Sequence, residues 1–377
     1  MKHLLVGNGI NIQFDNKSYA TKEIVLRILQ NCDRTDFPAH IIINEPYLMK
    51  NYIGRLFLEA RMALQGYYDE FANCKDEEMS LASFKEQYAN KLLTLKITDI
   101  GFEDYYLIHD LVCHKHHVVN PEQYEIRESM RVAYLLAIYN DGKLDDLHLS
   151  YPLAFIDYLN SFDSIFTTNY DSNVDAVCKK EIYHIHGWFK QISAVYDAES
   201  FRNQLPDAPI KTSSIDANFY YLYSNALTTH CGAYKEFQLK QYSYANDAIT
   251  KMALAYKTNP TVKNDIDLWM KQENKITANT GYAVKMKAEN PDLEFKDDYH
   301  FDKLSNIQSK LEILGLSPWN DFHIFEAIDK SNIMQCTYYY FSLEQRDKIK
   351  TLLPKLMAKG CIKFVPLTDF WRKMYEE

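Results

Sequence analysis

A short apolar segment runs straight into a glycine turn at the start of the chain. Leu4-Leu5-Val6 is followed at once by Gly7-Asn8-Gly9. This pattern is typical of a buried strand that ends in a tight turn, and it predicts the first strand of a parallel sheet. Further short apolar segments with polar boundaries predict strands over 164–168, 182–186, 311–316, 333–341 and 361–366.

Helical patterns fill most of the sequence between these strands. Apolar residues at three- and four-residue spacing predict helices over 21–31, 45–72, 80–95, 122–139, 237–256, 261–287 and 320–330. A last helix begins at the capping-box sequence Ser342-Leu343-Glu344-Gln345 and ends at Gly360. Because proline cannot continue a helix, Pro354 should kink or split it.

Strand and helix alternate at both ends of the chain, and helical blocks lie between. We therefore predict an α/β fold, in which one domain over residues 1–377 contains a Rossmann-like parallel sheet. The sheet is assembled from about 1–20, 151–200 and 305–377, with two large helical insertions over 21–150 and 201–304.

Composition narrows the class of protein. The formal net charge of −9 disfavours a broad basic face, so we expect no sequence-specific nucleic-acid binding. The first apolar segment is too short for a signal peptide, and the longest, at 132–139, is too short to span a membrane. Seven cysteines without paired spacing indicate reduced thiols, so we expect a cytoplasmic protein.

Two polar motifs follow predicted strands, at the sheet edge where open α/β folds bind ligands. The backbone N–H groups of Gly7-Asn8-Gly9 could face a phosphate, although the turn lacks a third glycine and is equally compatible with a plain strand end. Thr168, Asn169 and Asp171 stand at the C-terminal end of the strand predicted over 164–168. The alternative for these residues is an Asx turn that caps the next helix.

Histidines form two further candidates. His184 and His186 stand two residues apart at the end of a predicted strand, and we expect only one of them to face the ligand. The run Cys113-His114-Lys115-His116-His117 lacks a second ligand pair at metal-site spacing. We interpret it as a solvated loop and assign no metal ligand anywhere in the chain.

Taken in order, these motifs resemble those of the sirtuin-like NADases of bacterial anti-phage defence. GNGIN stands at 7–11, FTTNYD at 166–171 and HIHG at 184–187, and Gly315-Leu316-Ser317 precedes Asn320-Asp321. Sirtuins carry GAG, TQN, HG and a GTS-type turn in the same order, and defence members commonly carry TTNYD followed by LHG. The GNG turn and HIHG also resemble the AbiH abortive-infection proteins, whereas TTNYD favours the sirtuin-like family.

The resemblance implies a role for each matched residue. Asn169 would hold the nicotinamide ribose and position a water molecule, and His186 would act as general base, which leaves His184 to packing. The NAD-binding residues would be Gly7, Asn8, Gly9, Asn11, Thr168, Asp171, Gly315 and Ser317. Deacylating sirtuins carry a zinc ribbon of paired CxxC motifs, and this sequence contains none. The resemblance therefore implies NAD hydrolysis, with NAD as substrate and no metal.

The implied activity is an NAD-glycohydrolase that depletes NAD during abortive infection. Relatives of this kind often work with a HerA-type ATPase or a short Argonaute, so such a partner is expected. The two insertions and 29 tyrosines also favour a homo-oligomer. The alternatives are a non-catalytic subunit that binds NAD or ADP-ribose and an AbiH-type abortive-infection protein.

Overall fold

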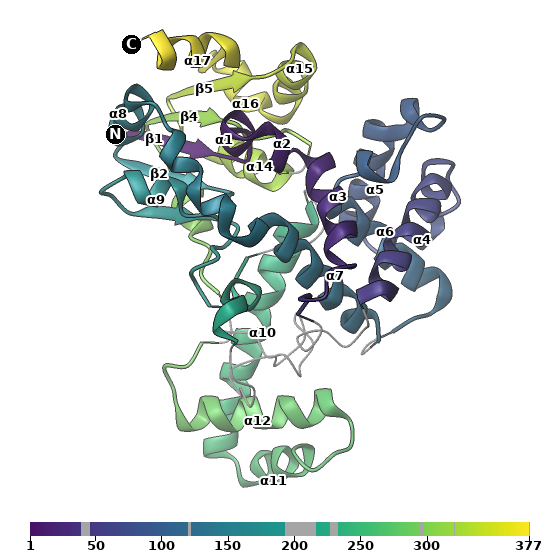
Figure 1. Ribbon diagram of the computed structural model, residues 1–377. Helices are drawn as coiled ribbons and strands as arrows, with labels where there is room; N and C mark the ends of the chain where they lie inside the picture. The colour runs from purple at the N-terminus through teal and green to yellow at the C-terminus, as the bar shows by residue number, and fades with distance from the viewer. Residues whose placement is uncertain are drawn as a thin grey trace.

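The fold is organised around a six-stranded sheet in which every strand runs parallel to its neighbours, in the order β3-β2-β1-β4-β5-β6 (Figure 1). The computed structural model describes residues 1–38, 46–119, 122–192, 216–226, 233–294, 297–319 and 321–376. The strands are β1 (Lys2–Val6), β2 (Ser164–Thr167), β3 (Ile182–His184), β4 (Lys310–Leu314), β5 (Gln335–Tyr340) and β6 (Ile362–Pro366).

This strand order confirms the predicted Rossmann-like parallel sheet. The chain winds outward from β1 through β2 to β3, then returns to the other side of β1 and winds outward again through β4, β5 and β6. The direction of winding reverses at β1, which is where doubly wound sheets bind their ligands. Val6 is level with both Thr167 and Leu314, so the three central strands end together.

Successive residues of a strand point to opposite sides of the sheet, and here both sides are apolar. Helices therefore cover both faces. Leu4 and Val6 pack with α8 (Leu153–Asn160) and α17 (Leu367–Glu376), and both residues are fully buried. Leu5 faces the opposite side, in the apolar cluster that contains α14 (Phe322–Lys330) and α16 (Pro354–Ala358). Burial on both faces explains why the strands are so apolar.

A block of helices follows β1 and has its own apolar core. It contains α3 (Thr21–Asn31), α4 (Pro46–Leu64), α5 (Lys75–Tyr88), α6 (Phe102–His116) and α7 (Glu122–Tyr139). The hydrophobic pattern does not predict α6, because every residue from Glu103 to Leu111 is buried and a helix buried on all sides has no amphipathic stripe.

The sequence interpretation of residues 113–117 was wrong. Cys113 to His116 form the last turn of α6, and His117 ends the helix in the left-handed conformation. Cys113 is buried, and His114 Nδ1 lies 2.9 Å from the carbonyl oxygen of Phe71. The run is therefore a packed helix end and not a solvated loop.

A second helical unit lies between β3 and β4, on the far side of the molecule from the β5–β6 edge of the sheet (Figure 1). It consists of α10 (Ala233–Thr258), α11 (Pro260–Trp269) and α12 (Lys275–Glu289), packed around Ile249, Ile266 and Val284. The sequence predicted one helix over 261–287, but the Asn274 side chain accepts a hydrogen bond from Thr277 N and begins a new helix there.

The C-terminal helix is divided as predicted. The Ser342 side chain accepts from Gln345 N at the start of α15 (Leu343–Leu352), and Pro354 then opens α16. No helix within the described ranges is both long and apolar enough to cross a bilayer. The remaining short helices are α1 (Gly9–Phe14), α2 (Asn16–Tyr19), α9 (Asn173–Val177) and α13 (Phe301–Ser305), with 3-10 turns at Asp69–Phe71, Ala89–Lys91, Ile97–Asp99, Asn140–Ser150 and Ala217–Tyr223.

Candidate functional site

The glycine turns after β1 and β4 pack directly against each other. Gly7 N donates to Leu314 O at 3.0 Å, and Gly9 N donates to Gly315 O at 2.8 Å. A Cβ atom on Gly9 would lie 2.5 Å from Gly315 Cα, so a side chain there would force the two turns apart. Close backbone packing therefore accounts for these glycines, and it corrects one expectation, because the N–H groups of Gly7 and Gly9 are already bonded and do not face a phosphate.

A cavity of about 660 Å³ opens at this edge of the sheet. Its volume falls within the range of roughly 300–1,000 Å³ that is usual for ligand pockets. Every residue of the candidate site except Gly7 lines it, namely Asn8, Gly9, Asn11, Thr168, Asn169, Asp171, His186, Gly315 and Ser317. Residues from three separate parts of the sequence thus meet at one place, the position that doubly wound sheets use for ligands.

The opposite wall of the cavity comes from the helical block. Gln87, Phe102 and Glu103 contribute from α5 and α6, and Ile138 contributes from α7. No motif in the sequence marks these residues, because none of them stands beside a strand end or in a polar cluster. The helices that follow β1 therefore enclose the site as well as building their own core.

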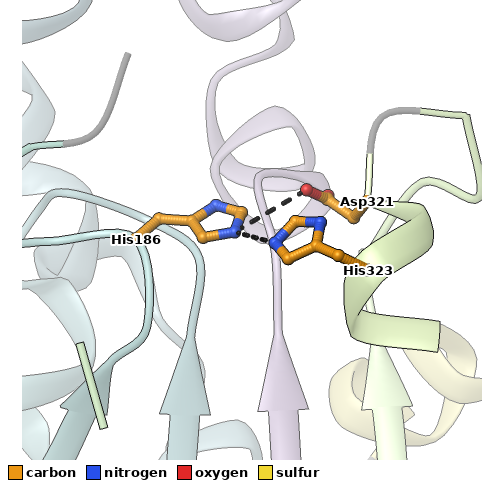
Figure 2. A group of neighbouring side chains, drawn as sticks. All are labelled: His186, Asp321 and His323. Atoms are coloured by element: carbon orange, nitrogen blue, oxygen red, sulfur yellow. Dashed lines mark hydrogen bonds and ion pairs between the residues drawn. The ribbon is translucent and has the colours of Figure 1, made fainter. Parts of the chain in front are cut away.

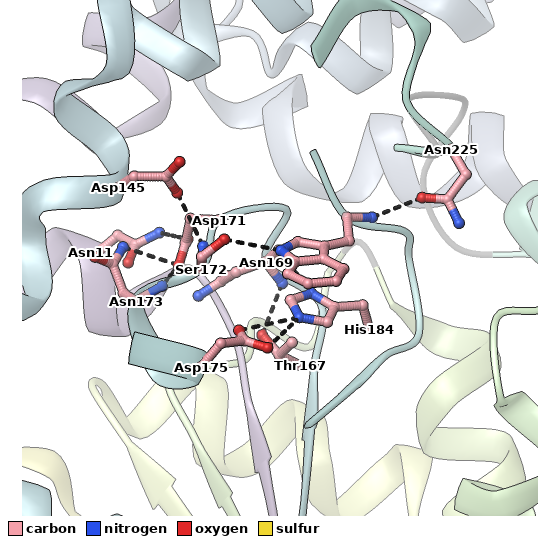
Figure 3. A network of polar contacts seen from close by, with 11 residues as sticks. Asn11, Asp145, Thr167, Asn169, Asp171, Ser172, Asn173, Asp175, His184 and Asn225 are labelled. Atoms are coloured by element: carbon pink, nitrogen blue, oxygen red, sulfur yellow. Dashed lines mark hydrogen bonds and ion pairs between the residues drawn. The ribbon is translucent and has the colours of Figure 1, made fainter. Parts of the chain in front are cut away.

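Asn11 and Asp171 hold each other inside the cavity wall. Asn11 Nδ2 donates to Asp171 Oδ2 at 2.7 Å, while Asp171 Oδ1 accepts from the backbone and side chain of Asn173 (Figure 3). Burial raises the pKa of Asp171 above its usual value, and the hydrogen bonds from Asn11 and Asn173 act in the opposite direction. The bond to Asn173 N is the Asx turn that the sequence left open as an alternative.

Two cavity residues, Asn169 and Asn11, carry side-chain amides that a bound ligand would contact. Asn169 lies at the end of β2, where its backbone N–H donates to Thr167 Oγ1 at 3.0 Å and its Nδ2 lies 3.4 Å from Gly7 O. Within the described part of the chain, Asn11 Oδ1 is buried and has no hydrogen-bond partner. A ligand hydroxyl that donated to this oxygen would satisfy it.

The two histidines at the end of β3 have different environments, but not because they alternate across the sheet. Residues two apart in a strand share a face, and the two rings diverge because β3 ends at His184 and His186 lies in the turn that follows. His184 packs away from the cavity, with its ring stacked on Trp188 and its Nε2 3.2 Å from Asp175 Oδ2. His186 instead lines the cavity and is 2% exposed. Gly187 makes the turn possible, because its φ is +91° and a Cβ there would lie 2.2 Å from Asn225 O.

His186 is joined by two residues to which the sequence pattern assigned no role, although Asp321 belongs to the quoted Asn320-Asp321 motif. His186 Nε2 lies 3.1 Å from His323 Nε2 and 3.9 Å from Asp321 Oδ1. Figure 2 shows the three side chains pointing toward one another. Asp321 precedes α14 and His323 lies in its first turn, after β4. The same signal that selected Asn169, a polar residue just beyond a strand, would have selected Asp321, whereas a lone His323 offered no pattern.

Comparisons of this chain with known protein families, with curated proteins and with solved structures found no match.

Proposed function

We propose that this protein is an NAD-glycohydrolase, which cleaves NAD to nicotinamide and ADP-ribose. The observation that carries the proposal is the meeting of Asn169 and His186 in one cavity at the point where the sheet reverses its winding. The sirtuin-like order of motifs selects these two residues, and the fold brings them together although they come from different strands.

The charges of the cavity favour the nicotinamide end of the substrate. Asp171, Asp321 and Glu103 line it, and among its described lining residues there is no lysine or arginine. Carboxylates stabilise the positively charged nicotinamide ring and the oxocarbenium-like centre that forms as the ring leaves. The pyrophosphate would then lie toward the turns at Asn8 and Ser317, with Thr168 nearer the ribose.

The reaction needs one water molecule and one base. The bond between ribose C1′ and the nicotinamide nitrogen breaks, and nicotinamide leaves with the electron pair. Water adds to C1′, with its proton passing to His186 Nε2, and Asn169 orients the ribose and the water. The products are nicotinamide, ADP-ribose and one proton.

A non-catalytic subunit that binds NAD or ADP-ribose is the second candidate. The 3.1 Å contact between His186 Nε2 and His323 Nε2 favours it, because hydrolysis would use this same His186 nitrogen as the base. An AbiH-type protein remains the alternative within abortive infection. On the basis of the resemblance to sirtuin-like NADases, we place the activity in anti-phage defence, with a HerA-type ATPase or a short Argonaute as partner.

Chromatographic detection of nicotinamide and ADP-ribose from NAD tests the activity. Wild-type protein, alone or reconstituted with the product of a neighbouring gene, should release both in equal amounts, whereas Asn169→Ala should release neither. Because Asn169 sits at a strand end, the variant should fold normally. Wild-type protein that binds NAD without forming either product would establish the binding subunit instead.

A further inference from the structure

Two residues of the cavity wall, His186 and Asp321, meet His323, and all three side chains are of types that bind metals. His186 comes from the turn after β3, while Asp321 and His323 come from the start of α14 (Figure 2). All three are buried, with exposed fractions of 2%, 7% and 2%. Two imidazoles and a carboxylate from separate parts of the sequence therefore converge where solvent is largely excluded.

The distances among these side chains suit a single metal ion. Two ligands on a tetrahedral ion with bonds of about 2.0–2.1 Å lie roughly 3.3 Å apart. The two Nε2 atoms are 3.1 Å apart, Asp321 Oδ1 is 3.9 Å from His186 Nε2, and one ligand atom from each residue lies within 4.8 Å of the others. Small side-chain adjustments would bring all three atoms onto one ion.

The surroundings support a cation and fix one of the imidazoles. The His323 ring is stacked on Phe301, with ring centroids 5.6 Å apart and planes 17° apart. Asp171 and Glu103 line the same cavity as Asp321. The contact between the two histidines and the His186–Asp321 ion pair bring three ligand-type side chains together, which is the arrangement that one ion would require.

We propose that His186, Asp321 and His323 bind a divalent transition-metal ion, for which Zn²⁺ is the probe. Two imidazoles and a carboxylate form a ligand set typical of zinc and of non-haem iron. Each histidine would present its Nε2 lone pair and carry its proton on Nδ1. With three protein ligands, the ion keeps a further position for water or another small ligand.

The site has a consequence that rests on the proposed function. His186 Nε2 cannot bind a metal and accept a proton at the same time, because both use one lone pair. Bound Zn²⁺ should therefore inhibit NAD hydrolysis, and a chelator should restore it. Faster hydrolysis with Zn²⁺ would overturn this competition.

Calorimetric titration of Zn²⁺ into the chelator-treated full-length protein, without NAD, tests the site itself. We expect one saturable site per chain. His323→Ala and Asp321→Ala each remove a ligand, so they should weaken binding by more than the roughly 10–100-fold that follows loss of a residue merely supporting a ligand. His116→Ala is the matched control, because His116 is exposed on α6, and it should bind as wild type. Unchanged affinity in His323→Ala would overturn the proposal.

A second measurement covers the case in which a variant fails to fold. Co²⁺ added to wild-type protein should give the intense visible bands of a four-coordinate ion, and Zn²⁺ should displace them. Their absence would overturn the site without the use of any variant. Neither measurement needs NAD. Metal binding and NAD hydrolysis are therefore tested separately, and failure of one proposal does not imply failure of the other.

Discussion

His184 and His186 are two residues apart in the sequence and have opposite environments. His184 is buried against Trp188 and Asp175, and His186 lines the cavity. His184→Ala should lower the free energy of unfolding by about 1–3 kcal/mol through loss of buried hydrogen bonds. His186→Ala should lower NAD turnover by roughly 100-fold or more and leave NAD affinity largely intact.

Initial rates, NAD affinity and melting temperature of both variants provide the measurement. A stable but inactive His184→Ala protein beside an active His186→Ala protein would show that His184, and not His186, meets the ligand.

Asp171 provides a prediction about pH. Burial raises its folded-state pKa above the ordinary value of 3.8, so the folded protein retains this proton where the unfolded chain has lost it. Stability therefore falls as pH rises from about the unfolded pKa through the folded one. The stability of wild type relative to Asp171→Asn, which cannot ionise, should decrease across that interval.

Urea unfolding of both proteins at a series of pH values from about 4 to 7 measures this difference. A relative stability that increased with pH would mean that the hydrogen bonds from Asn11 and Asn173 outweigh burial.

Single residues also show how far the candidate site can be read from sequence. The positions of Asn169 and His186 follow from their places beyond two strands, and both line the cavity. Asp321, which was quoted only as part of a motif, and His323 were assigned no role, since their proximity to His186 depends on the packing of α14. Of the two interpretations left open for the Gly7-Asn8-Gly9 turn, the one in which the N–H groups of Gly7 and Gly9 face a phosphate is wrong, because the β4 turn occupies them and the sequence does not show this.

At the scale of elements, glycine positions give a matched pair of substitutions. Gly187→Ala introduces a Cβ at a φ of +91°, only 2.2 Å from Asn225 O, so it should destabilise the fold by about 2 kcal/mol or more. Gly54→Ala lies inside α4, where a Cβ would meet nothing within 4 Å, and it should stabilise the fold by about 0.5–1 kcal/mol.

Thermal or urea unfolding of the two variants supplies the values. If Gly187→Ala were as stable as wild type, the packing of the HIHG turn against Asn225 would be incorrect.

The elements that were predictable share one property, which is a local signal. Each strand is a short apolar segment with polar residues at its ends, and α7 matches its expected range. Ser342 and Pro354 mark the starts of α15 and α16. The elements that were missed depend on tertiary packing. The helix α6 is buried on all sides and therefore shows no amphipathic pattern. The start of α12 is marked only by the Asn274 cap. The division into one core with two insertions stays a prediction.

At the scale of the whole molecule, the helical unit α10–α12 leaves several large apolar side chains in solvent. Tyr244, Leu254 and Leu268 are more than half exposed, and Tyr282 is 44% exposed. Such a surface favours association between chains. We expect a homo-oligomer, which Leu254→Asp combined with Leu268→Asp should dissociate toward the monomer.

Light scattering on dilute protein gives the mass directly. Leu153→Asp is the control, because Leu153 is 79% exposed on α8, outside this unit, and it should leave the mass unchanged. A wild-type protein that is strictly monomeric, alone and with its partner, would contradict the expectation.

The central claim is that the cavity at the sheet's winding reversal binds NAD with its nicotinamide ribose beside Asn169 and residue 186. A crystal structure of the His186→Ala variant grown with saturating NAD tests it most directly, since this variant should bind the dinucleotide without cleaving it. We predict density for intact NAD in the cavity, with the ribose next to Asn169 and the pyrophosphate toward Asn8 and Ser317. NAD bound elsewhere on the protein, or an empty cavity at saturating NAD, would contradict the account.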